Sequence, residues 1–321
     1  MGSRGESSNQ TWITNGSTAS GANGFSDSGA VYIYEKVGSL WQQTAYIKPS
    51  NANSGYQFGS SVSLSGTQLA VGSPFESSNQ VGITNGSTAS SDTSMQGEGA
   101  VYIFEKAGLT WQQTAYIKDS CPAMEFGTYF GFSVSLSGNH LVVGDPGEGT
   151  NSPGTYTGAG APCSMYANYG GAYVFLKLGG NWVESGRLKA PYLGAGDAFG
   201  LSVAIHGNRM VVGAMDEDGN STTIINGTSA VNNDNSPASG AAYVFSRFQS
   251  NYIQEAYLKP SNSDPGDNFG YSVDVYGNYV LVGAPKERAK HFSVINGGSA
   301  SNNNSYVDAG AAYLFECVDG Q

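Results

Sequence analysis

The chain has 321 residues, of which 46 are glycine and 12% are charged, and its formal net charge is −11. A surface with this excess of negative charge repels phosphate backbones, so the composition disfavours nucleic-acid binding. No apolar run has the length of a membrane span. The first ten residues lack the apolar core of a signal peptide, so we expect either a trimmed piece or an export signal outside this sequence.

Along the chain, the same predicted strands return about every 70 residues. A short aromatic strand reads "YIY" at 32, "YIF" at 102, "YVF" at 173 and 243, and "YLF" at 313. The segment "WQQTAYIK" stands at 41 and 111 and returns as "WVESGRLK" at 182 and "YIQEAYLK" at 252. Markers in fixed order and spacing indicate a protein built from one repeated structural unit.

Each repeat predicts four short strands. In residues 61–65, Val62 and Leu64 alternate with serines, which indicates a half-buried strand. An apolar run follows at 68–72, then a polar loop of about two dozen residues, then a strand rich in β-branched and aromatic residues at 100–106. The fourth strand begins at "WQQTAYIK", and helical periodicity is absent from the sequence.

Four short antiparallel strands per repeat are typical of a β-propeller blade. One four-stranded sheet cannot bury both of its faces, whereas sheets that pack face to face can. We therefore predict an all-β fold, a single propeller domain over residues 1–321 built from ~70-residue blades. In "FGYSVDVYGNYVLVGAP", Phe269 is expected to wedge between adjacent blades, and Pro285 is expected to end a strand.

The strand count leaves the closure of the propeller open. Complete blades are predicted at 58–118, 130–189 and 199–258, and residues 269–316 combine with 30–48 in a composite blade. One third-position strand is then left over, so we expect four blades plus a surplus strand. Three outcomes fit: a four-bladed ring with a spare strand, a larger ring with repeats outside this sequence, or an unclosed array that pairs with a neighbouring copy.

The phrases "FGYSV", "VLVGAP" and "GAAYLF" resemble the FG-GAP repeat, the blade motif of the integrin α-subunit head and of many extracellular proteins. The resemblance runs over residues 6–316 and is strongest to the microbial and algal members. It implies a propeller that binds proteins or carbohydrates at the cell surface, usually without catalysis.

The resemblance also implies a calcium loop after the second strand, of D-x-D-x-D-G type. Here "DEDGN" places oxygen ligands at Asp216, Asp218 and Asn220, a spacing that suits a hard cation. The downstream bidentate carboxylate is missing, and the last repeat has Lys286 and Arg288 in this region. Calcium, the one cofactor that the sequence suggests, and a solvated acidic turn both remain open interpretations.

The long loops carry a recurring Asn-Gly turn and several glycosylation sequons. Sequons stand at Asn9, Asn15, Asn85, Asn220, Asn226 and Asn303. If the protein is secreted by a eukaryote, Asn15, Asn85 and Asn226 are the best candidates, because each lies in the recurring turn; otherwise these are turns only. Cys121 and Cys163 fall in loops of one repeat, as a disulfide or as two thiols.

Evidence for an active site is weak. His140, His206 and His291 lack metal-ligand spacing, and no G-x-S-x-G motif is present. Asp197 and Asp267, each two residues before "FG", are expected to cap a turn.

We therefore predict a non-catalytic extracellular module that binds a protein or glycan at a cell surface or in the matrix. The alternative is a structural subunit of an extracellular fibre that self-associates through its unpaired strand. A carbohydrate-active enzyme is the third hypothesis.

Overall fold

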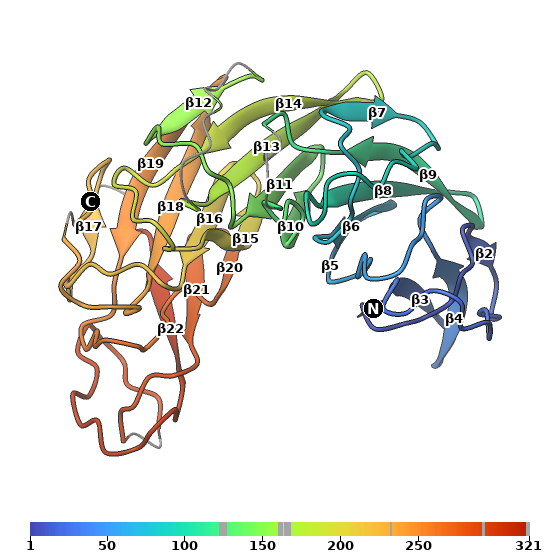
Figure 1. The fold of residues 1–321 in the computed structure, drawn as a ribbon. Coiled ribbons are helices and arrows are strands. Elements are labelled where there is room, and N and C mark those ends of the chain that lie inside the picture. Colours follow the sequence, from blue (N-terminus) through green and yellow to red (C-terminus); the bar gives the residue numbers. More distant parts are fainter. Residues whose placement is uncertain (122–126, 160–162, 164–167, 232, 291–292, 319–321) are drawn as a thin grey trace. The chain divides into compact units, whose positions relative to one another are not determined.

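The computed structural model describes residues 1–121, 127–159, 163, 168–231, 233–290 and 293–318, and these residues form strands and turns but no helix (Figure 1). His291 lies outside them. The strands form five separate antiparallel sheets, which confirms the predicted all-β fold of FG-GAP blades.

The sheets share one strand order, which follows the repeat. The N-terminal sheet runs β1 (Gly2–Ser3), β3 (Ala30–Val37), β4 (Leu40–Ile47), β2 (Thr14–Asn15). The second runs β5 (Ser61–Ser65), β6 (Gln68–Ser73), β8 (Ala100–Ala107), β9 (Thr110–Ile117), β7 (Ile83–Asn85). The third runs β10 (Ser133–Ser137), β11 (His140–Asp145), β13 (Gly171–Leu178), β14 (Asn181–Leu188), β12 (Thr155–Thr157). The fourth runs β15 (Phe199–His206), β16 (Arg209–Ala214), β18 (Ala241–Phe248), β19 (Asn251–Leu258), β17 (Ile225–Asn226). The fifth runs β20 (Ser272–Tyr276), β21 (Tyr279–Ala284), β22 (Ala311–Glu316).

A short strand from the long loop was not predicted. In three repeats the Asn-Gly segment of the loop forms this strand, as β2, β7 or β17, and in the third repeat residues Thr155–Thr157 form it as β12. Each pairs with the fourth strand of its own sheet, as β7 does with β9. An exposed strand edge invites unwanted pairing. The loop therefore covers this edge in each of the first four sheets.

The chain divides into two compact units, residues 1–143 with 175–183 and residues 144–174 with 184–321, so that the third sheet contributes to both. In the N-terminal sheet, β4 pairs with β3 on one edge and with β2 on the other. In the fifth sheet, β22 pairs with β21. The composite blade of residues 269–316 with 30–48 stays a prediction, and its formation would require β4 to exchange one of these partners.

The phenylalanine of each "FG" joins two neighbouring sheets. Phe58 is fully buried, and its ring lies edge-on to Tyr102 and Phe104 of its own sheet at 5.3 and 5.9 Å. Its backbone forms a β-bridge to Gly29, which precedes β3 of the previous sheet. Gly29 has a φ of +81°, and a Cβ there would lie 2.0 Å from the Phe58 carbonyl oxygen, so only glycine permits this approach. The same bridge recurs at Phe130, Phe199 and Phe269. The predicted packing role of these residues is thus observed.

The innermost strands of the second and third sheets are joined through serine side chains. Ser61 Oγ of β5 accepts a hydrogen bond from the Val134 N–H of β10 at 2.9 Å, and the next serine repeats the contact two residues on. The apolar side chains of β5 point the other way and are exposed, 37% for Val62 and 59% for Leu64. The predicted alternation in residues 61–65 is observed. The apolar face of β5 is nevertheless exposed, because the described part of the N-terminal sheet has no innermost strand that could pack against it.

Candidate functional site

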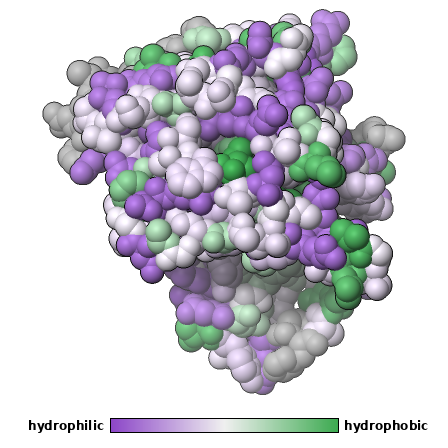
Figure 2. Space-filling view, turned by 90° about the vertical axis from the view of Figure 1, so that its right-hand side faces the viewer, coloured by the Kyte–Doolittle hydropathy of each residue, from purple (hydrophilic) through white to green (hydrophobic). Residues whose placement is uncertain are grey.

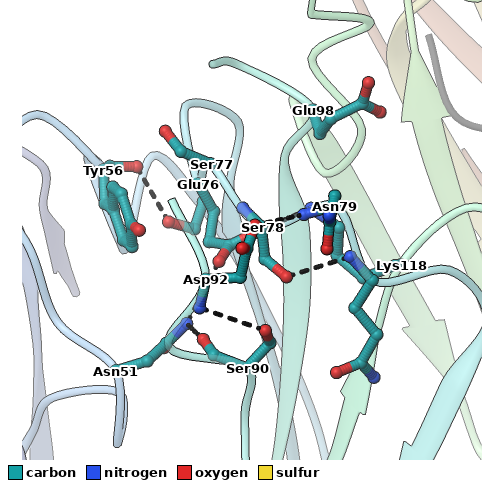
Figure 3. Close-up of polar contacts among 12 residues, drawn as sticks. Asn51, Tyr56, Glu76, Ser77, Ser78, Asn79, Ser90, Asp92, Glu98 and Lys118 are labelled. Atoms are coloured by element: carbon teal, nitrogen blue, oxygen red, sulfur yellow. Dashed lines mark hydrogen bonds and ion pairs between the residues drawn. The ribbon is translucent and has the colours of Figure 1, made fainter. Parts of the chain in front are cut away.

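Each long loop begins at a glutamate that is anchored to its own sheet. Glu76 is fully buried, and its Oε2 accepts a hydrogen bond from Lys118 Nζ at 2.7 Å (Figure 3). Lys118 directly follows β9, the fourth strand. The Glu76 backbone carbonyl accepts from Gly99 N at 2.9 Å, which ties the start of the loop to its end. The loop therefore leaves and re-enters the sheet at one fixed place.

The same ion pair recurs in three other sheets. Lys48 pairs with Glu6 at 2.9 Å and Lys259 with Glu217 at 2.6 Å, and Lys189 pairs with Glu148. Burial lowers the pKa of Lys48, Lys189 and Lys259 and raises the pKa of Glu76, because loss of water penalises the charged form. The partner charge offsets this penalty, so removal of either member leaves a costly isolated charge.

Sequence reasoning missed these pairs, although the signal is present. Glutamates recur at 6, 76, 148, 217 and 287, and lysines recur at 48, 118, 189 and 259. The two series have nearly the same period as the aromatic strands. The structure shows that four of these five glutamates bind a lysine.

An asparagine in the linker between sheets forms a second anchor. Asn51 Nδ2 donates to Glu76 Oε1 at 3.1 Å and to the Ser90 carbonyl at 2.7 Å (Figure 3). Its Oδ1 accepts a hydrogen bond from Tyr102 OH at 2.6 Å. Asn262 repeats all three contacts before the fifth sheet. The linker thus holds the loop of the sheet that follows it.

The linker position of Asn51, three residues after the buried lysine, is taken by Cys121 in the next repeat. Cys121 and Cys163 form a disulfide, whereas Cys317 is a free thiol. A cysteine in a disulfide therefore occupies the linker position that carries a hydrogen-bonding amide at Asn51 and Asn262.

The asparagine of the recurring Asn-Gly turn clamps one sheet to the next. Asn15 Oδ1 accepts from Trp111 N at 2.8 Å. Asn85 Oδ1 accepts from Trp182 N at 2.8 Å, and Asn85 Nδ2 donates to the Trp182 carbonyl at 3.2 Å. The first two turn sequons thus have a structural role that the sequence did not reveal, and a glycan on Asn85 Nδ2 would replace the bond to Trp182.

Glycosylation stays a prediction at all six sequons. Their asparagines are exposed, including Asn9, Asn220, Asn226 and Asn303. Within the described part of the chain, the Asn226 side chain makes no hydrogen bond. A glycan on Asn226 would therefore displace none of the hydrogen bonds of the described residues, in contrast to a glycan on Asn85.

The three oxygens predicted to bind calcium are held by three different partners. Asp216 Oδ1 accepts from Asn268 Nδ2 at 3.1 Å, Asp218 Oδ1 from Ala238 N at 2.7 Å, and Asn220 Oδ1 from Asn233 Nδ2 at 3.1 Å. In the described residues no group of three or more His, Cys, Asp or Glu side chains could hold a metal ion. These donors would compete with a cation for the same oxygens, and calcium at this place stays a prediction.

Asp197 and Asp267 act as turn caps. Asp197 Oδ2 accepts from Gly194 N at 3.0 Å, and Asp267 Oδ2 accepts from Asp264 N at 2.8 Å. Burial raises the pKa of Asp197 to about 7 and the pKa of Asp267 to about 6, and the nearby carboxylates of Glu217 and Glu287 add to the respective shifts. Each carboxylate closes its own turn, as the sequence predicts.

A shallow depression of about 330 Å³ lies between the N-terminal and second sheets, within the first compact unit. Its lining includes Trp12 and Trp111, with Gln112 and Gln113. Trp12 is 62% exposed, and the second repeat has Gly82 in its place. An exposed aromatic ring beside amide groups is suited to a ligand with both an apolar face and hydroxyl groups.

These features define a class of protein: a repeat scaffold of antiparallel blades that holds long, exposed loops at fixed positions. The FG-GAP repeat matches residues 41–104, 182–245 and 252–315, more than half of the chain, and the protein belongs to this family. Each match begins at a fourth strand and ends in the third strand of the next sheet. No curated protein matches the chain. Among the described residues, no helix is long and apolar enough to cross a membrane.

Proposed function

We propose that this protein is a non-catalytic, extracellular binding and adhesion module that presents its long loops to a protein or glycan at a cell surface or in the matrix. The proposal rests on the observation that the recurring charged side chains make structural contacts within the scaffold. Four of the five recurring glutamates pair with a buried lysine. Asp197 and Asp267 cap turns, and Asn15 and Asn85 bind the backbone of a neighbouring sheet. The repeated polar groups thus position the loops, and binding is left to the exposed loop residues.

The long loops have the character of a recognition surface. They carry exposed apolar side chains, with exposed fractions of 51% for Val81, 47% for Ile224 and 87% for Val294. Binding residues commonly lie on loops held by a rigid scaffold. On the face shown in Figure 2, hydrophobic residues form small separate groups among hydrophilic ones.

The extracellular location is supported by the Cys121–Cys163 disulfide, because such bonds persist in oxidising compartments. The six exposed sequons are consistent with the same location.

A glycan array with the purified chain tests the proposal, with intrinsic tryptophan fluorescence to follow any hit. If the depression takes a sugar, Trp12→Ala abolishes binding of that glycan. Trp41, 70% exposed on β4 and outside the depression, is the matched control, and its change to alanine leaves binding unchanged. Absence of binding to glycans and to matrix proteins would contradict the proposed function, and turnover of a bound glycan would favour the enzyme hypothesis.

A structural role in a fibre is the second candidate. It is favoured by the fifth sheet, whose Tyr276 and Leu314 are 74% and 67% exposed. Sedimentation velocity distinguishes the two functions. A fibre subunit forms larger species as concentration rises, and a chain that stays monomeric at micromolar concentration is not one.

A further inference from the structure

Three side chains of the second sheet bring an amine, a carboxylate and a carboxamide together in one cluster. Lys118 and Glu76 are 1% and 0% exposed, and Lys118 Nζ donates to Glu76 Oε2 at 2.7 Å. Asn51 Nδ2 donates to the other oxygen of the same carboxylate, Glu76 Oε1, at 3.1 Å (Figure 3). The lysine nitrogen and the asparagine amide are thus held by the two oxygens of a single buried carboxylate.

The surroundings of this cluster favour a reaction between the amine and the amide. Tyr102 OH donates to Asn51 Oδ1 at 2.6 Å, so a donor polarises the amide carbonyl and is placed to stabilise negative charge on its oxygen. Tyr102 is fully buried, as is Glu76. Burial raises the pKa of Glu76, which favours transfer of the Lys118 proton to this carboxylate. The contacts are therefore those of a nucleophile, a proton carrier and an activated acyl group.

From this geometry we propose that Lys118 and Asn51 form an intramolecular isopeptide bond, with Glu76 as the group that carries the protons. Lys118 Nζ first gives a proton to the carboxylate. Its electron pair then attacks Asn51 Cγ, and the charge that develops on Oδ1 is stabilised by the Tyr102 hydroxyl. The Cγ–Nδ2 bond breaks, and two protons from Nζ pass through Glu76 to the departing nitrogen, which leaves as ammonium. The products are one amide, one ammonium ion and the restored carboxylate, so the step needs no oxidant or co-reactant.

The fourth sheet has the same ion pair without the amide. Lys259 Nζ lies 2.6 Å from Glu217 Oε2, and both side chains are buried. The linker position that corresponds to Asn51, three residues after the preceding lysine of the series, is Tyr192. A tyrosine offers no acyl carbon to the amine, so this pair stays ionic. The lysine–glutamate pair is thus a common anchor of the sheets, and the asparagine adds the reactive group in the second.

The bond joins the place where the chain enters the second sheet to the place where the chain leaves it. Asn51 precedes β5, the first strand of this sheet, and Lys118 directly follows β9, the last. Tension along the chain is then carried by the bond, and the strands between residues 51 and 118 stay folded. At the next linker, Cys121 is joined covalently to Cys163. The bond forms whether or not the long loops bind a ligand, so it does not depend on the proposed function.

Intact mass spectrometry of the whole chain, reduced and denatured, tests the proposal. The measured mass should lie about 17 Da below the mass calculated from the sequence, which is the loss of one ammonia. A proteolytic digest should contain a branched peptide in which Lys118 is joined to Asn51, and Lys118→Met should restore the full mass. The full mass in the unaltered chain would overturn the proposal. So would a loss of ammonia that survives Lys118→Met, because it would come from ring closure at another asparagine.

Three further variants separate the chemistry from the fold. Glu76→Gln keeps the shape of the side chain but removes the proton carrier, so this variant should show its full calculated mass. Glu217→Gln is the matched change in the fourth sheet and should leave the loss of ammonia unchanged. Asn51→Asp keeps an acyl carbon and releases water instead, so its product is the same amide and has the same mass as that of the unaltered chain. A bond that still forms in Glu76→Gln, or that is lost in both glutamine variants, would overturn the role assigned to Glu76.

Discussion

The second and fifth sheets have nearly the same sequence pattern but different surroundings. Ile103 on β8 is fully buried, whereas Leu314, at the same position of β22, is 67% exposed. Both sheets have the buried glutamate, the linker asparagine and the third-strand tyrosine. The fifth sheet lacks a fourth strand in the described residues, and one of its faces has no neighbour there. The difference shows that a blade of this protein obtains much of its burial from strands and sheets next to it.

The largest expected effect comes from removal of a cation from a complete sheet. Lys118→Met leaves the Glu76 carboxylate buried without a partner, which should lower the free energy of unfolding by about 3–5 kcal/mol. Urea denaturation measures the loss. Lys106→Met is the control, since Lys106 pairs with the half-exposed Glu35 and should contribute less than about 1 kcal/mol. Equal losses for the two variants would show that burial of the Glu76–Lys118 pair has no special role.

Removal of an asparagine that clamps two sheets together should lower stability by a smaller amount. Asn85→Ala removes two hydrogen bonds to the backbone of Trp182, and we expect a loss of about 1–2 kcal/mol of unfolding free energy. Asn226→Ala, at the same position of the fourth repeat, should change stability by less than about 0.5 kcal/mol. A similar loss at both positions would mean that the turn itself, and not the clamp, is responsible.

At Glu287, removal of the charge is expected to raise the free energy of unfolding instead of lowering it. Burial raises the pKa of this carboxyl, so at pH 8 its charged form is penalised, and Glu287→Gln should stabilise the free chain by up to about 1 kcal/mol. The gain should disappear at pH 4, where the folded protein already binds the proton. Glu76→Gln should instead destabilise, because Lys118 then has no counter-ion. Thermal unfolding at the two pH values checks both signs.

The last prediction concerns the pH dependence of the turn cap at Asp197. The pKa of Asp197 rises to about 7 in the folded chain, above its value of about 4 when unfolded. The folded state therefore binds more protons between these values, and stability contributed by this group falls as pH rises from about 4 to about 7. Asp197→Asn keeps the oxygen that accepts from Gly194 and should flatten this part of the stability profile. An unchanged profile would show that Asp197 titrates at an ordinary pKa.

Local patterns in the sequence were sufficient to predict the strands of each blade, but not the contacts between residues that lie far apart in the sequence. Period-two alternation and aromatic strands identified the four strands of each repeat, because these signals lie within a few residues of one another. The sequons at Asn15 and Asn85 were interpreted by motif alone, and their contacts with tryptophans 96 or 97 residues later were missed. The ion pairs were missed for the same reason, since Lys118 and Glu76 are 42 residues apart.

The sequence by itself determined the repeat length, the strand pattern and the FG-GAP family, because each repeat carries the local residues that form its turns and strands. Only the tertiary structure decided which apolar faces are buried, which carboxylates have a cation and which edges remain open. Those properties depend on neighbours from other repeats. Val62 and Val134 have the same local sequence, "SVSLS", yet one is 37% exposed and the other 6%, because only the second faces another inner strand.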